Sequence, residues 1–145
     1  MRVLVISKAP RKTDEQPLPI KVGDNAAAFE AMGKYIQAMT EAGVMVQAEG
    51  LKPSRFAKRV RADGSKRTVT DGPFTETKEV IASYTLLEVK SLDEALEWIK
   101  RVPDPHDGPM EYELRPVLDP SDFDFGGAMP AQEEEEWKKM SGRDR

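Results

Sequence analysis

The sequence predicts an α+β fold of the ferredoxin-like, split βαβ type, with a hairpin inserted near its middle and an extra helix at its C-terminus. Three observations predict this fold: four apolar segments suited to strands, two helical segments between them, and an order in which one βαβ unit follows another within 145 residues. We expect residues 1–120 to form the α+β domain and residues 121–145 to form a linker and a polar helix.

The first βαβ unit begins with an expected strand over residues 2–7, whose apolar side chains fall on both faces, as in a central strand. Asp24 or Asn25 then caps an expected helix, and Gly43 ends it in the usual C-terminal position. One stripe of this helix is apolar at helical spacing, which favours packing in the core: Phe29, Met32, Ile36 and Met39.

The middle of the chain predicts two strands of the sheet with a hairpin between them. Residues 44–51 predict the second strand of the sheet, and residues 55–70 predict the inserted hairpin with its turn at Asp63-Gly64. Residues 80–89 predict the third strand of the sheet, which again is apolar on both faces.

The second helix is expected to begin at a capping box. In this motif the Ser91 hydroxyl accepts a hydrogen bond from the Glu94 amide, and the Glu94 carboxylate reaches back to the cap amide. We expect Leu92, Leu96 and Ile99 to face the core.

The chain closes with a strand and a helix. Residues 111–118 predict the last strand of the sheet, and Pro130 is suited to start a terminal helix. The acidic run Glu133–Glu136 near the start of this helix suits the helix dipole. Trp137 and Met140 are its candidate docking residues, and its remaining polarity favours packing on a partner or fraying.

The sheet is expected to need a partner. Both helices of a split βαβ fold lie on one face of the sheet, whereas the strands at residues 2–7 and 80–89 are apolar on both faces. Exposed apolar patches of several hundred Å² are rare on monomers. We therefore expect a homodimer in which two sheets pack face to face through an isologous interface.

Composition excludes several kinds of site. The chain has no Cys and one His, which excludes a disulfide framework, a thiolate zinc site, a cysteine nucleophile and a metal site built from histidines. We therefore expect no metal and no cofactor. The chain has no pattern of a signal peptide and no apolar stretch of ~20 residues, so we expect a cytoplasmic protein without a membrane partner.

Charge is distributed unevenly around a net value of −4. Residues 51–70 carry seven bases and one acid, whereas residues 71–145 carry 19 acids and nine bases. We interpret the basic stretch as a solvated hairpin whose cations protect a sheet edge. Binding to nucleic acid is not expected, because the rest of the chain is acidic and Phe56 is the one aromatic residue in that stretch.

Residues 69–79 read Val-Thr-Asp-Gly-Pro-Phe-Thr-Glu-Thr-Lys-Glu. This run resembles the signature of the DGPF-motif branch of the YCII-related family. Residues 42–51, 92–98 and 112–117 resemble the second strand, the second helix and the closing strand of that family. The resemblance covers residues 29–118.

This resemblance implies a bacterial protein of the dimeric α+β barrel type, with no established reaction. Family members are often encoded beside sigma factors of the extracytoplasmic-function type, which implies a signalling context. Members of the wider YCII group have been suspected of being enzymes that use a His and an Asp. In this sequence His106 is the one His, and Asp71 would have to be the matching aspartate.

The residues themselves also suggest a site. We expect Asp71 and Glu79 to present carboxylates at a cleft between sheet and helices, with Glu49 beside them. Partly desolvated carboxylates have raised pKa values and can act as general acid or base. Arg115 would bind an anionic ligand or pair with an acid, and the Tyr84 hydroxyl would line the pocket.

Each candidate also has a structural interpretation. Asp71, with Gly72 and Pro73, would only direct the chain from the hairpin into the next strand. Arg115 would form a salt bridge across the sheet, and His106 would be solvated among the prolines and acids of its loop. Glu49 would be a buried acid satisfied by Arg115 or by a backbone amide, and Tyr84 would only pack on its strand.

Three functions follow as hypotheses. The preferred one is a dimeric small-molecule-binding or regulatory module without turnover, in a signalling context. The alternative is a cofactor-free enzyme that performs acid/base chemistry as an isomerase or lyase, or lactone chemistry, on a small anionic substrate, with Asp71 and His106 as its catalytic residues. The third is a protein-interaction module that docks through its basic hairpin and acidic tail.

Overall fold

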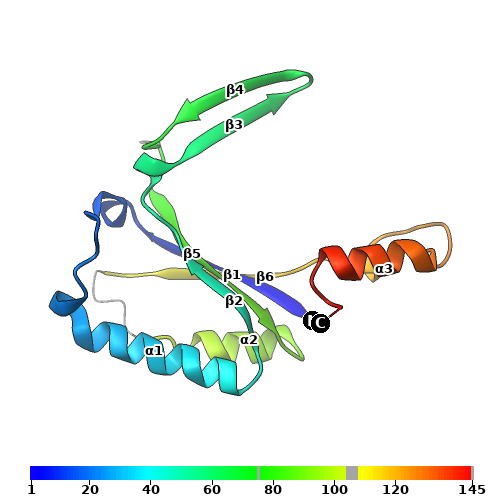
Figure 1. Ribbon diagram of the computed structural model, residues 1–145, viewed down its shortest axis with the longest axis horizontal. Helices are drawn as coiled ribbons and strands as arrows, with labels where there is room; N and C mark the ends of the chain where they lie inside the picture. Colours follow the sequence, from blue (N-terminus) through cyan, green and yellow to red (C-terminus); the bar gives the residue numbers. More distant parts are fainter. Residues whose placement is uncertain (75, 104–107, 145) are drawn as a thin grey trace.

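A computed structural model describes residues 1–74, 76–103 and 108–144. The main body is formed by β1 (Arg2–Pro10), α1 (Ala26–Glu41), β2 (Met45–Gly50), β5 (Glu79–Glu88), α2 (Leu92–Ile99) and β6 (Glu111–Pro116). The strands form an antiparallel sheet in the order β2-β5-β1-β6, and the two helices cover one of its faces (Figure 1). This order is that of a ferredoxin-like sheet, so the predicted α+β fold is confirmed.

The inserted hairpin forms a separate two-stranded sheet, β3 (Lys58–Asp63) and β4 (Lys66–Asp71). It stands away from the main sheet on the side opposite α1 and α2 (Figure 1). Its turn contains Gly64 at a φ of 56°, a left-handed conformation that glycine adopts without steric cost. The predicted hairpin and its turn are therefore confirmed.

The terminal helix α3 (Ala131–Met140) lies beyond the end of the sheet where the two chain termini meet (Figure 1). None of its residues is buried. Met140 is 83% exposed, so the prediction that it docks the helix was wrong. Instead, the Arg2 guanidinium donates hydrogen bonds to the carbonyls of Ser141 and Gly142 and holds the end of the helix.

The core lies between the sheet and the two helices. Val3, Val5 and Leu87 are fully buried, and the cluster is completed by Met39, Val44, Val89 and Ala95. Burial alternates along β1, because successive side chains of a strand point to opposite faces. The sequence predicted that this strand is covered on both faces, but within one chain its second face is only half-buried, at Leu4 and Ile6.

Helix α2 begins at the predicted cap residue, Ser91, but the residues that it buries differ from those predicted. The Ser91 hydroxyl accepts from the Glu94 amide at 3.1 Å, whereas the Glu94 carboxylate accepts from the amide of Lys90 rather than that of Ser91. Ala95 is the buried residue of this helix, and Leu92 and Leu96 are each 40% exposed. The prediction that both leucines face the core was wrong because the small Ala95 side chain lies against the sheet.

The Asp-Gly-Pro turn joins the hairpin to β5 through a close backbone contact. The Gly72 amide donates to the Ala57 carbonyl at 2.9 Å. A Cβ atom at Gly72 would lie 1.8 Å from the carbonyl oxygen of Ser54, a separation that no side chain tolerates. Ser54 is itself held by Asp14, whose carboxylate accepts from the Ser54 amide at 2.6 Å. The glycine is therefore required by the backbone that crosses it.

Replacing Gly72 by Ala is expected to lower the free energy of unfolding by about 2–3 kcal/mol, because the Ser54 backbone must shift. Urea denaturation followed by circular dichroism measures this. Gly33→Ala is the matched control: no atom lies within 4 Å of the added methyl group in α1, so a gain of about 0.5–1 kcal/mol is expected. A Gly72→Ala protein as stable as wild type would contradict the steric role of the turn.

No helix in the described ranges is both long enough and apolar enough to cross a membrane.

Candidate functional site

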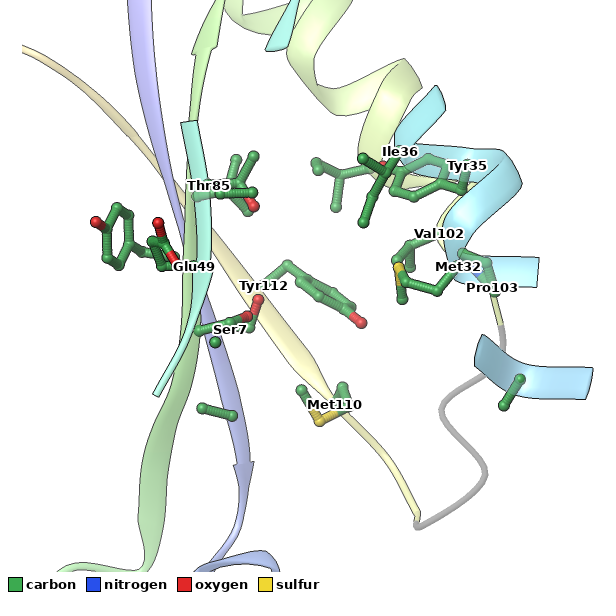
Figure 2. Close-up of a pocket in the computed structure, with 18 of the residues that line it drawn as sticks. Ser7, Met32, Tyr35, Ile36, Glu49, Thr85, Val102, Pro103, Met110 and Tyr112 are labelled. Atoms are coloured by element: carbon green, nitrogen blue, oxygen red, sulfur yellow. The ribbon is translucent and has the colours of Figure 1, made fainter. Parts of the chain in front are cut away.

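A cavity of about 540 Å³ lies between α1 and the helix-covered face of the sheet (Figure 2). The apolar stripe of α1 forms one wall. Only Met39 of this stripe is buried, at 2% exposure, whereas Phe29, Met32 and Ile36 are 37–45% exposed and line the cavity. The prediction that the whole stripe packs in the core was therefore wrong for these three residues. Met39 anchors the C-terminal end of α1 in the core, and the N-terminal half stands off the sheet (Figure 1).

The sheet contributes hydroxyl groups to the opposite wall. Ser7 and Thr85 project from the strands, and Tyr112 extends from β6 towards Met32 (Figure 2). Burial raises the pKa of the Tyr112 phenol above its usual value, so the ring is neutral at neutral pH. Within the described residues the Tyr112 hydroxyl has no hydrogen-bond partner, whereas that of Tyr35 donates to the Trp98 carbonyl at 2.9 Å. No described residue therefore occupies the hydrogen-bonding capacity of the Tyr112 hydroxyl.

Glu49 is the one charged residue among the described residues that line the cavity, and its side chain lies on the far side of β2 (Figure 2). A β-bulge between Met45 and Gln47 shifts the register of this strand. Glu49 consequently pairs with Tyr84 on the face of the sheet opposite α1 and α2, the uncovered face among the described residues. On that face the Gln47 amide donates to the Tyr84 hydroxyl at 3.0 Å.

Arg115 also lies on the uncovered face, at the opposite edge of the sheet from Glu49. Two strands separate β6 from β2, a span of about 14 Å, so the two side chains do not meet within one chain. Arg115 instead pairs with Glu113 at 3.1 Å, and Lys8 pairs with the same carboxylate at 2.7 Å. Hydrogen bonds from Lys8 and then from Arg115 hold the pKa of Glu113 below its usual value.

The two remaining carboxylate candidates, Asp71 and Glu79, do not lie at the cavity. Asp71 is exposed at the end of β4 and pairs with Lys58 at 2.5 Å. Glu79 is exposed at the start of β5, and neither carboxylate lines the cavity. His106 lies outside the described residues; Pro103 and Met110, on either side of it in the sequence, line the cavity.

No three His, Cys, Asp or Glu side chains come together as a metal site within the ranges that the structure describes. The cavity is therefore an apolar space with neutral hydroxyl groups, able to bind a molecule by apolar contact and hydrogen bonding.

One sequence signal could have located this cavity. Ser83 and Thr85 occupy the helix-facing positions of β5, a central strand, where a packed core would require apolar residues. Ser7 occupies a helix-facing position on β1, where it lies opposite Ser83 of β5 and Tyr112 of β6. Polar residues at three neighbouring core-facing positions indicate a hollow in the layer between sheet and helix.

Comparison with known proteins gives the family of this chain. The sequence model of the YCII-related domain matches residues 1–119. An uncharacterized protein of Rhizobium meliloti (strain 1021) is 35% identical to this chain over 84 residues. The matched region covers 58% of this chain and 64% of the relative, which is less than two thirds of the relative's length. Because the family match covers most of the chain and includes every strand of the main sheet, the protein belongs to the YCII-related family.

Proposed function

We propose that this protein is a homodimeric small-molecule-binding protein without turnover, whose ligand occupies the cavity between α1 and the sheet. The observation that carries the proposal is the cavity itself. Its volume of about 540 Å³ falls within the range of ligand pockets, and its walls are mainly apolar with a few hydroxyl groups.

The lining favours a neutral, compact and mainly apolar ligand with one polar group. No Lys or Arg belongs to the described lining, so a buried anion would lack a counter-ion there. This chemistry differs from the small anionic ligand expected from the sequence. The Tyr112 hydroxyl is the proposed hydrogen-bond partner of the polar group, because nothing in the described residues occupies it.

A regulatory role in a signalling context fits the anchoring of α1. The buried residue Met39 lies near the C-terminal end of this helix, while the N-terminal half contributes half-exposed side chains to the cavity. Weakly packed segments adjust at low energetic cost. A ligand in the cavity would therefore draw the N-terminal half of α1 towards the sheet.

Naphthol, a neutral bicyclic molecule with one hydroxyl group, is expected to bind and to raise the melting temperature, while naphthoate, its anionic counterpart, is not. Met32→Trp should fill the cavity and weaken naphthol binding by about tenfold or more. Lys34→Trp is the matched control on α1, because the Lys34 side chain is 75% exposed and outside the cavity. Tyr112→Phe should weaken binding by about fivefold, the loss of one hydrogen bond.

Titration by fluorescence and by thermal shift measures these affinities. Equal binding by the two tryptophan variants would exclude the cavity as the site. Tighter binding of naphthoate than of naphthol would contradict the neutral ligand.

The homodimer in this proposal is supported by the uncovered face of the sheet. Leu4 and Leu86 pair across β1 and β5 on this face, and Ile6 and Tyr84 pair beside them, all half-buried within one chain. Ile81 on the same face is 57% exposed. A second sheet packed on these side chains would remove them from water. Glu49, Tyr84 and Arg115 would then belong to the interface between subunits rather than to the cavity.

Leu86→Lys is expected to convert the dimer into a folded monomer, because it places a charge at the centre of the interface. Leu96→Lys is the matched control: Leu96 is 40% exposed on α2, away from the uncovered face, and this variant should stay dimeric. Light scattering measures the mass and circular dichroism the fold. A wild-type protein that is monomeric at tens of micromolar would refute the dimer.

The alternative function is a cofactor-free enzyme for acid/base chemistry on a small substrate. The specific observation in its favour is that Pro103 and Met110, which flank His106 in the sequence, line the cavity. Small lactones and enolisable acids, followed by NMR in deuterium oxide, separate the two functions. For a protein without turnover, we expect the substrate C–H protons to exchange with deuterium no faster than they do in buffer alone. Exchange that is lost in His106→Gln and in Asp71→Asn would establish catalysis and overturn binding without turnover.

A further inference from the structure

The β3–β4 hairpin, called here the arm (residues 58–71), is exposed throughout. Each of its strand residues is exposed, and the two strands pair with no other strand that the structure describes. Val60 and Val69 lie directly opposite each other and are 63% and 60% exposed. An isolated two-stranded hairpin is at best marginally stable in water. The arm therefore requires a covering surface that one chain does not supply.

The arm is also cationic. Lys58 pairs with Asp71 and Arg59 with Glu76, but Arg61 and Lys66 make no ion pair with any described residue. Arg67 lies on the same face of the ribbon as the two valines, and its guanidinium donates only to backbone carbonyls near the turn. The covering surface should therefore combine carboxylates with apolar side chains.

Residues 119–136, called here the acidic segment, have these properties. They contain seven acids and no base. Phe123 and Phe125 within them are 51% and 42% exposed, and their ring centroids lie 6.1 Å apart. Glu133 and Glu136, in the first two turns of α3, form no salt bridge with any described residue. The exposed rings and free carboxylates of this segment match the two valines and the Arg67 guanidinium, which share one face of the arm.

The base of the arm and the acidic segment lie near opposite ends of the main sheet (Figure 1). The arm precedes the start of β5, whereas α3 is tied to Arg2, which pairs with Glu88 at the end of β5. Strand β5 has 10 residues and spans about 33 Å. The arm and the acidic segment therefore lie apart within a single protomer.

A twofold axis can bring them together. In the proposed face-to-face dimer, the twofold axis lies in the plane between the two sheets. An axis perpendicular to the strands reverses the strand direction, so each arm lies beside the acidic segment of the other subunit. An axis along the strands would place the two cationic arms side by side, where like charges repel. Charge complementarity therefore favours the first arrangement, in which the contact occurs twice by symmetry.

We propose that the arm is an intersubunit arm, which docks on the acidic segment of a second copy of this chain. The inference rests on the dimer of the proposed function and adds the orientation of the two subunits and the contact that sets it. The valines pack against Phe123 and Phe125, and the cations of the arm lie near the carboxylates of α3.

Cysteine cross-linking tests the contact directly, because the chain has no Cys of its own. The variant Ala62→Cys with Ala128→Cys carries one thiol in the arm and one in the acidic segment. A short bismaleimide is expected to give a covalent dimer on a denaturing gel. The matched control is Ala62→Cys with Ala31→Cys, whose second thiol lies on the exposed side of α1 outside the cavity, and it should give none.

The outcomes separate this inference from the dimer itself. A dimer by light scattering that gives no more cross-link than the control would refute the arm contact and leave the dimer standing. A cross-linked monomer would also refute it, because the two thiols would then meet within one chain. A wild-type protein that is monomeric throughout would refute both.

Charge reversal provides a second test. Arg67→Glu, on the valine face of the arm, should weaken the dimer about fivefold at low salt and flatten its salt dependence. Adding Glu133→Arg and Glu136→Arg to this variant should restore both the dimer affinity and its salt dependence. Sedimentation velocity measures the two properties. No change in either variant would refute the contact. Binding of duplex DNA that the first variant abolishes, with its dimer unchanged, would make the arm a nucleic-acid surface and overturn the proposal.

Discussion

The antiparallel pairing of β1 with β5 determines the rest of this structure. Its register places Val3 opposite Leu87 on one face and Leu4 opposite Leu86 on the other. The first pair is buried under the two helices, and the second stays half-exposed. Because side chains alternate along a strand, one register decides at once where the core lies and which face remains for a partner.

The same sheet explains why a cavity exists beside a tight core. Val3, Val5 and Leu87 supply apolar bulk at one end of the central strands, where Met39 and Ala95 pack on them. Towards the other end the helix-facing positions carry Ser7, Ser83 and Thr85, which are small and polar. Because these residues offer little apolar surface, α1 does not pack against them. The C-terminal end of the helix packs in the core, and its N-terminal half lies away from the sheet.

The Asp-Gly-Pro-Phe motif has a clear structural role in the described residues. Gly72 allows the backbone to pass Ser54, Asp71 pairs with Lys58, and the Phe74 ring stacks on the Arg59 guanidinium. The ion pair closes the base of the arm, and the contacts of Gly72 and Phe74 join that base to the segments on either side of it. The most distinctive sequence in the chain therefore lies at the joint between body and arm, away from the cavity.

The sequence by itself determined the order of strands and helices, the hairpin turn, the cap at Ser91 and the family resemblance, because periodicity, turn chemistry and motifs are local properties. It predicted Glu49 and Arg115 as parts of one site. Only the tertiary structure showed that a bulge directs Glu49 away from the helices, and that sheet order places the two residues on opposite edges. Likewise, helical periodicity identified the stripe of α1 but could not distinguish a core from the wall of a cavity. That distinction depends on what the opposing strand presents, which is a contact between residues far apart in the chain.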